Sequence, residues 1–261
     1  MQWDPAQYAR FSDERSRSFF DLVGQIGAEQ PGQVVDLGCG SGELTATLAL
    51  RWRAATIRGL DASAEMIERA AAVAGGRLSF ALADAADFNA SGVDVLISNA
   101  LLQWLPGHQA LLSRWAGQLA AGGWLAFQVP ANFGSPSHRL MRELSVSARW
   151  RDRLAGVLRH GDAVAEPADY LKVLADSGLR VNAWQTSYLH VLSGDDPVLE
   201  WVRGSGLRPV LQALAEDEAA EFTAEYAALQ RQADPPGPFG TVFPFLRTFV
   251  VASKSVSAAT Q

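Results

Sequence analysis

Apolar residues in the first half of the chain fall into short runs that alternate with helix-forming segments. Such alternation is typical of a parallel sheet covered by helices on both faces. The predicted strands cover residues 33–38, 56–61, 78–82, 93–98 and 124–129, and the predicted helices cover residues 42–51, 63–74 and 107–120. We therefore predict an α/β fold for this region.

The pattern changes after Pro130, where residues 132–162 are rich in arginine and have little strand character. The elements predicted beyond this segment are a helix over 167–177, a helical stretch over 195–232, and strands over 181–192 and 245–253. These two strands would pair antiparallel and extend the sheet to seven strands. By the two-residue period of a strand, Trp184, Thr186, Tyr188 and His190 share one face.

We interpret the chain as a single domain over residues 1–254. A helical cap or lid is expected from about 132–165 and 195–240, and residues 1–30 are expected to be helical. The Ser/Ala-rich tail at 255–261 is expected to be disordered.

A glycine-rich segment follows the first predicted strand, with Gly38, Gly40 and Gly42 before a helix and Asp61 at the end of the next strand. This order of strand, glycine loop, helix, strand and acid is typical of sites that bind the adenosine part of a cofactor, with the acid accepting hydrogen bonds from the ribose. A dinucleotide site and a tight turn without a ligand are the alternatives. The G-x-G-x-G spacing and Asp36 favour a cofactor with an ammonium group, because an acid at this strand end would repel a pyrophosphate.

The segment DLGCGSG resembles motif I of the class I S-adenosylmethionine (SAM) methyltransferases. That resemblance implies a Rossmann-like, mostly parallel sheet. Further candidate ligands lie after the third and fourth strands, at Asp84 and at Ser98–Asn99. Asp84 could instead cap a helix, and Trp104 on the next turn could belong to the core.

The composition excludes several functional classes. A net charge of −6 argues against a general nucleic-acid binder, and no apolar run is long enough to cross a membrane. The N-terminus lacks a signal-peptide core, and Cys39 is the only cysteine, which fits a reducing cytoplasm. The four histidines show no metal-ligand spacing, so we expect no metal.

Methyl transfer from a sulfonium depends mainly on alignment, and no pair of residues suggests a general base. An acceptor that is already ionised, such as a carboxylate, is therefore favoured. Its expected partners are arginines. The candidates are Arg15, Arg17, Arg208, Arg247 and the arginines of 139–159.

Several segments narrow the resemblance to one family. WDPAQYARFSDERSR, NALLQWLPGH, PANFGSPSHRLMRE, WQTSYLH and WVRGSGLRP, together with the two cofactor motifs, resemble the trans-aconitate 2-methyltransferase family over residues 3–254. Membership would imply a bacterial cytoplasmic enzyme. It would transfer a methyl group from SAM to a carboxylate of trans-aconitate, giving the monomethyl ester and S-adenosylhomocysteine (SAH).

The resemblance also implies site residues. The cofactor would be bound by Asp36, Gly38, Gly40, Gly42, Asp61, Ala62, Met66, Asp84, Ala85, Ser98 and Asn99. The acceptor would be positioned by Tyr8, Arg15, Gln103, Trp104, Tyr188, His190 and Arg208. Residues 147–165 depart most from the family pattern. Another polycarboxylate, a phenol or an amine stays open as acceptor, as does a SAM-binding protein without catalysis.

Overall fold

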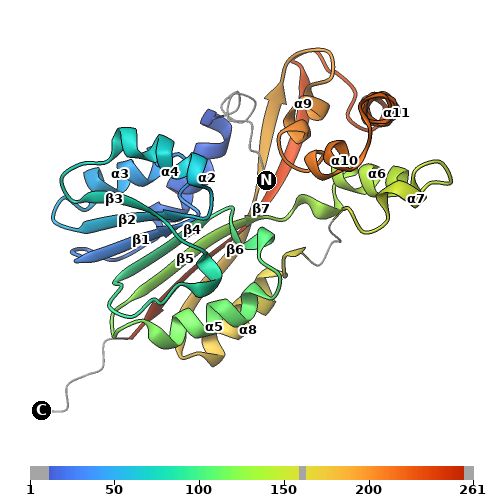
Figure 1. Cartoon of the computed structure of the whole chain (residues 1–261). Helices are drawn as coiled ribbons and strands as arrows, with labels where there is room; N and C mark the ends of the chain where they lie inside the picture. The colour runs from blue at the N-terminus through green and yellow to red at the C-terminus, as the bar shows by residue number, and fades with distance from the viewer. Residues whose placement is uncertain (1–11, 159–162, 256–261) are drawn as a thin grey trace, which may run out of the picture. The chain divides into compact units, whose positions relative to one another are not determined.

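The computed structural model describes residues 12–158 and 163–255, with the side chains of 12–15 left out (Figure 1). The described residues divide into two compact units. The first unit contains residues 16–130, 164–186 and 248–255, and the second contains residues 131–158 and 187–247 together with the short ends 12–15 and 163. Apart from residues 164–165, the described parts of the predicted cap segments fall in the second unit, and the single-domain boundary of 1–254 stays a prediction.

A sheet of seven strands runs through the described residues in the order β3-β2-β1-β4-β5-β7-β6. The five parallel strands are β1 (Gln33–Leu37), β2 (Thr56–Asp61), β3 (Leu78–Leu82), β4 (Val95–Asn99) and β5 (Trp124–Pro130). Strands β1, β4 and β5 are buried along almost their whole length, as apolar strands covered on both faces should be. The mostly parallel α/β fold is confirmed.

Helices cover both faces of the parallel strands (Figure 1). On one face lie α5 (His108–Gln118) and α8 (Pro167–Asp176), and on the other lie α2 (Ser12–Gly24), α3 (Glu43–Arg51) and α4 (Ala64–Ala70). Trp115 of α5, Phe127 of β5 and Tyr170 of α8 are fully buried in one core cluster. The predicted N-cap Ser63 is confirmed, because its hydroxyl accepts the Met66 N–H at 3.4 Å.

The last two strands are β6 (Leu179–Leu192) and β7 (Thr241–Lys254), and both contribute to the two units. Backbone bonds join Lys254 to Gly123 and Ala131 to Leu246, so β7 runs antiparallel to β5. We expected this strand to begin at residue 245, after Pro244, but it begins at Thr241. The backbone groups of Leu246 face β5, and those of Pro244, two residues earlier, face the same side. At Pro244 the strand β5 has already ended, so the N–H that proline lacks would have had no partner in the sheet.

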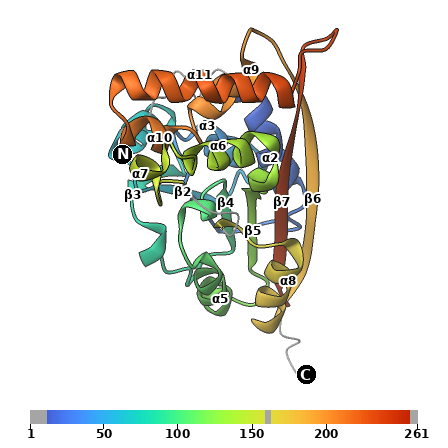
Figure 2. The same cartoon turned by 90° about the vertical axis from the view of Figure 1, so that its right-hand side faces the viewer.

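The second unit is mainly helical. Its helices are α6 (Pro136–Ser145), α7 (Arg151–Leu154), α9 (Pro197–Arg203), α10 (Arg208–Ala213) and α11 (Glu216–Ala233) (Figure 2). The helical stretch predicted over 195–232 is thus three helices, because glycines precede Arg208 and a non-helical pair, Leu214–Ala215, precedes α11. Its core contains Met141, Trp150, Trp201, Phe222 and Phe243.

Short 3-10 turns connect the longer elements in both units. They are η1 (Ala71–Val73), η2 (Ala85–Asp87), η3 (Leu102–Trp104) and η4 (Asn132–Gly134). Within the described part of the chain, none of the helices is both long enough and apolar enough to cross a membrane.

Candidate functional site

The glycine loop between β1 and α3 is tied back to the end of β2. Gly38 N–H and Cys39 N–H both donate to the Leu60 carbonyl, at 2.7 and 3.1 Å. Gly38, Gly40 and Gly42 all have positive φ angles, of 76°, 57° and 84°. These backbone conformations favour glycine, which explains the spacing seen in the sequence.

The three glycines differ in what a side chain would meet. A Cβ atom on Gly38 would lie 2.9 Å from Leu101 Cβ, and one on Gly42 would lie 2.7 Å from Phe80 Cζ. A Cβ atom on Gly40 would meet no atom within 4 Å. Gly38 and Gly42 therefore allow close packing, while Gly40 faces open space that a ligand could enter.

Asp61 at the end of β2 holds the loop from the other side. Its two carboxylate oxygens accept Gly40 N–H and Ser63 N–H, both at 2.9 Å. Each oxygen keeps a second lone pair, and the side chain is only partly buried. The carboxylate is thus oriented by the loop and still able to accept hydrogen bonds from a diol.

Asp36 is the second acid of the loop region and is 2% exposed. Its Oδ2 accepts the Thr45 hydroxyl at 2.6 Å, whereas no hydrogen bond to Oδ1 is found in the described structure. Burial raises the pKa of Asp36 to about 7, the Thr45 bond opposes that shift, and the charge of Asp61 adds to it. A buried acid with an unused oxygen fits the ammonium group of SAM, because a nearby cation would favour the ionised carboxylate.

Strand register brings a further pair of side chains to the face that carries the two acids. Asp36 is aligned with Ile97 of β4 and with Gly59 of β2, and Asn99 is aligned with Gln128 of β5. Because side chains two residues apart share a face, Asp36, Asp61, Asn99 and Gln128 lie on the same face of the sheet. The structure therefore brings together Asp36, Asp61 and Asn99 from the predicted set.

The end of β4 and the turn after it hold three more of the predicted residues. Ser98 is buried, and its hydroxyl has no hydrogen-bond partner within the described residues. Gln103 is buried and donates through Nε2 to the Ala100 carbonyl at 2.6 Å. Trp104 is half-buried, so it is not a pure core residue.

The residues predicted near the adenine have mixed roles. Asp84 is exposed and caps η2, with Oδ1 accepting Ala86 N–H at 2.8 Å, which is the alternative that the sequence left open. Met66 and Ala85 are buried, and Ala62 is exposed. Capping uses one oxygen of Asp84, so the other could still accept a bond from a ligand.

In the second unit, Tyr188 and His190 lie in a buried aromatic cluster. The two rings stack 6.3 Å apart, and His190 stacks on Trp201 at 4.7 Å. Arg247 is 5% exposed and places its guanidinium carbon 4.7 Å above the Phe245 ring. A buried guanidinium beside aromatic rings is an environment in which a carboxylate can be bound in a fixed orientation.

Other acceptor candidates are less defined. Arg208 is half-buried at the start of α10. Tyr8 and the side chain of Arg15 lie outside the described residues. Several arginines of the 139–159 segment are already in ion pairs, such as Arg139 with Glu143 and Arg149 with Glu221 and Glu225.

Cys39 is poorly suited to act as a nucleophile. Burial raises the pKa of the Cys39 thiol, which weakens it as a nucleophile. Among the described residues, no group of three His, Cys, Asp or Glu side chains could hold a metal ion.

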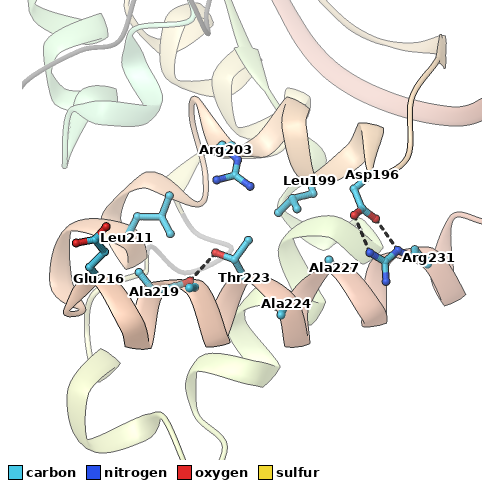
Figure 3. A pocket seen from close by; sticks show the side chains of 11 residues that line it. Asp196, Leu199, Arg203, Leu211, Glu216, Ala219, Thr223, Ala224, Ala227 and Arg231 are labelled. Carbon is cyan, nitrogen blue, oxygen red and sulfur yellow. Dashed lines mark hydrogen bonds and ion pairs between the residues drawn. The ribbon is translucent and has the colours of Figure 1, made fainter.

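A cavity of about 490 Å³ lies among α9, α10 and α11 of the second unit (Figure 3). Its wall includes Thr223, whose hydroxyl donates to the Ala219 carbonyl, and the ion pair of Asp196 with Arg231, with both N–O distances at 2.7 Å. None of the predicted site residues lines it. It does not resemble the predicted acceptor site.

Gln128 is absent from the residues predicted for the site, although it lies in the strand predicted over 124–129. Gln128 is fully buried, and its Nε2 donates to Asn99 Oδ1 at 2.7 Å. The available signal was a primary amide within an otherwise apolar strand.

A family model, curated relatives and solved structures similar to this chain are all described as methyltransferases. Residues 34–123 match the family model described as "Methyltransferase domain". A Streptomyces avermitilis protein named trans-aconitate 2-methyltransferase is 54% identical to this chain, and the alignment covers 97% of each chain. A Streptomyces coelicolor protein of the same name is 53% identical, and the alignment covers 97% of this chain and 86% of the relative. A Haemonchus contortus phosphoethanolamine N-methyltransferase solved with SAH shares the fold, with a TM-score of 0.53, 14% identity, and coverage of 92% of this chain and 52% of the other.

Proposed function

We propose that this chain, which belongs to the trans-aconitate 2-methyltransferase family, transfers a methyl group from SAM to a carboxylate of trans-aconitate. The products would be SAH and the monomethyl ester. The observation that carries this proposal is 54% identity to a relative of that name over 97% of both chains. We also propose that the enzyme acts in the cytoplasm.

The first unit supports the cofactor part of the proposal. SAM, when bound, supplies an electrophilic methyl group on a positively charged sulfur. Asp61 would accept hydrogen bonds from the ribose, and Asp36 Oδ1 would accept a hydrogen bond from the ammonium group. Gly40 would let the cofactor approach the backbone, because no atom fills the space where its side chain would be. Met66, Asp84 and Ala85 would complete the adenine end.

The second unit supports an anionic acceptor. Arg247, Arg208 and the stacked pair Tyr188–His190 would hold the carboxylates that do not react. In the first unit, Gln103 and Trp104 stay predicted acceptor residues. A carboxylate has a pKa of roughly 4 and is ionised at neutral pH, so its attack on the methyl carbon needs no general base. Orientation of the acceptor is then the main task of the protein.

The test is an acceptor panel with purified enzyme and isotopically labelled SAM. We expect kcat/KM for trans-aconitate to exceed that for cis-aconitate, a monocarboxylic acid, a catechol and a primary amine by at least tenfold. Faster transfer to the catechol or the amine would overturn the acceptor assignment. Arg247→Met should raise KM for trans-aconitate at least tenfold with an unchanged Kd for SAH, while the surface control Arg139→Met should change neither.

A further inference from the structure

Gln128 bonds to the end of β4 in two ways. Its side-chain Nε2 donates to Asn99 Oδ1 at 2.7 Å, and its backbone carbonyl accepts Ala100 N–H at 3.0 Å. The residue is 0% exposed. One buried glutamine therefore fixes both the Asn99 side chain and the backbone that follows it.

The backbone at this point is strained. Ala100 has a φ angle of 56°, and it is the only non-glycine residue with a positive φ in the described part of the chain. Gln103 Nε2 secures the same turn by donating to the Ala100 carbonyl. Strain of this kind persists where the surroundings hold it in place, and it clusters at functional sites.

The bond from Gln128 also decides which end of the Asn99 amide is available. A carboxamide has one oxygen that accepts and one nitrogen that donates twice. The oxygen of Asn99 accepts the bond from Gln128, and Nδ2 has no hydrogen-bond partner among the described residues. Asn99 thus offers a double donor on the face that carries the acid Asp36, on the neighbouring strand β1.

We propose that Gln128 is a positioning residue of the cofactor site, which orients Asn99 so that Nδ2 binds the carboxylate of SAM. The amino-acid end of SAM carries an ammonium and a carboxylate group. The acid on β1 complements the first, and the amide donor on β4 complements the second. This inference rests on the cofactor of the proposed function and not on its acceptor.

The test compares the binding of SAH with that of 5′-methylthioadenosine, which has no carboxylate, by calorimetry. Gln128→Met removes the donor, and we expect it to raise the Kd for SAH about tenfold while the Kd for methylthioadenosine changes less than twofold. In the Asn99→Ala background, the same substitution should have no further effect on SAH. An equal rise in the Kd values of both ligands would overturn the proposal. So would a tenfold rise in the Kd for SAH when Gln128→Met is made in the Asn99→Ala background.

Gln128→Glu adds a pH readout that loss of packing alone would not give. An ionised Glu accepts only, so it should turn the Asn99 amide around, whereas a protonated Glu can donate as Gln128 does. The Kd ratio of variant to wild type for SAH should therefore grow from pH 5.5 to pH 8. A ratio that does not change with pH would contradict the orienting role.

The carboxylate could instead come from the acceptor, and the KM for trans-aconitate at saturating SAM distinguishes the two sources. We expect that KM to change less than twofold in Gln128→Met. A raised KM with an unchanged Kd for SAH would overturn the assignment to SAM. Gln118→Met is the matched control, because it removes a glutamine whose Oε1 accepts Ala90 N–H at 2.9 Å in the same unit. It should leave both ligands unaffected, and failure of trans-aconitate as a substrate would not alter any of the SAH results.

Discussion

Cofactor binding is expected to release a proton from Asp36. The carboxyl group is buried, which raises its pKa to about 7, and its unused oxygen fits the ammonium of SAM. A cation at this oxygen favours the ionised form and lowers the pKa. The substitution that isolates this effect is Asp36→Asn, which keeps the shape and an acceptor for Thr45 but removes the charge.

The expected magnitude follows from the pKa. With a pKa of about 7, Asp36 is about nine-tenths protonated at pH 6 and about one-tenth protonated at pH 8. SAH binding should thus release about 0.9 proton at pH 6 and about 0.1 at pH 8. The affinity for SAH should rise about tenfold between these two pH values, relative to the Asn variant.

The assay is calorimetry of SAH binding in two buffers with different ionisation enthalpies. The difference in heat between the buffers gives the number of protons released, and the Asp36→Asn variant subtracts any titration of the ligand itself. Equal heats in the two buffers at pH 6, or the same proton release from the variant, would refute the assignment of Asp36 to the ammonium.

The same pKa predicts an effect on folding without any ligand. The folded-state pKa of about 7 lies above the unfolded value of 3.8, so the folded state binds more protons between these limits. The free energy of unfolding should therefore fall as pH rises from 4 to 7, by about 3 kcal/mol relative to Asp36→Asn. Urea denaturation at a series of pH values measures this. If the free energy of unfolding depended on pH in the same way in the wild type and in Asp36→Asn, Asp36 would not be protonated in the folded state.

Three further predictions concern the same unit. Asp61→Ala should raise the Kd for SAH at least tenfold, because charge-assisted hydrogen bonds contribute roughly 1.5–3 kcal/mol each, and an unchanged Kd in calorimetry would exclude Asp61 as the ribose ligand. Ala100→Gly should match or exceed the wild-type unfolding free energy in urea, whereas Ala100→Val should lower it by more than about 1 kcal/mol; equal stability of the two variants would argue against strain at this turn. The His108 ring accepts or donates a bond with Tyr170 at 2.8 Å, and burial lowers its pKa, so stability should be lost as pH falls below 6.5. His108→Phe should be less stable at pH 7.5 and should lose less on acidification, and thermal unfolding at both pH values checks this.

The cofactor site at the carboxyl ends of the parallel strands was largely predictable, because short sequence segments determine its main features. Gly38 and Gly42 need positive φ and close packing, and the apolar runs on either side set the strands that carry Asp36 and Asp61. Parallel strands end at one edge of a sheet, so the acids and Asn99 could be placed together before the structure was known.

The features that were missed depend on contacts between distant segments. A positive φ at Ala100 has no local signature, because alanine normally avoids it, and the turn is held by Gln128, far along the chain. The early start of β7 was not predicted, because a proline such as Pro244 usually ends a strand. Only the backbone hydrogen bonds between β5 and β7 show that the Pro244 nitrogen lies beyond the end of β5. The role of Asp84 as a cap was left open for a different reason. Its contact with Ala86 is local, but a carboxylate can cap a turn with one oxygen and bind a ligand with the other, so the sequence does not distinguish the two roles.

The most direct test of the proposed activity is the product formed from trans-aconitate and SAM with a ¹³C-labelled methyl group. We expect a single new methyl-ester resonance in the NMR spectrum, in an amount equal to the SAH formed. This resonance should disappear on mild alkaline hydrolysis with release of labelled methanol. SAH formation without that resonance, or a labelled methyl group that survives alkali, would contradict methyl transfer to a carboxylate.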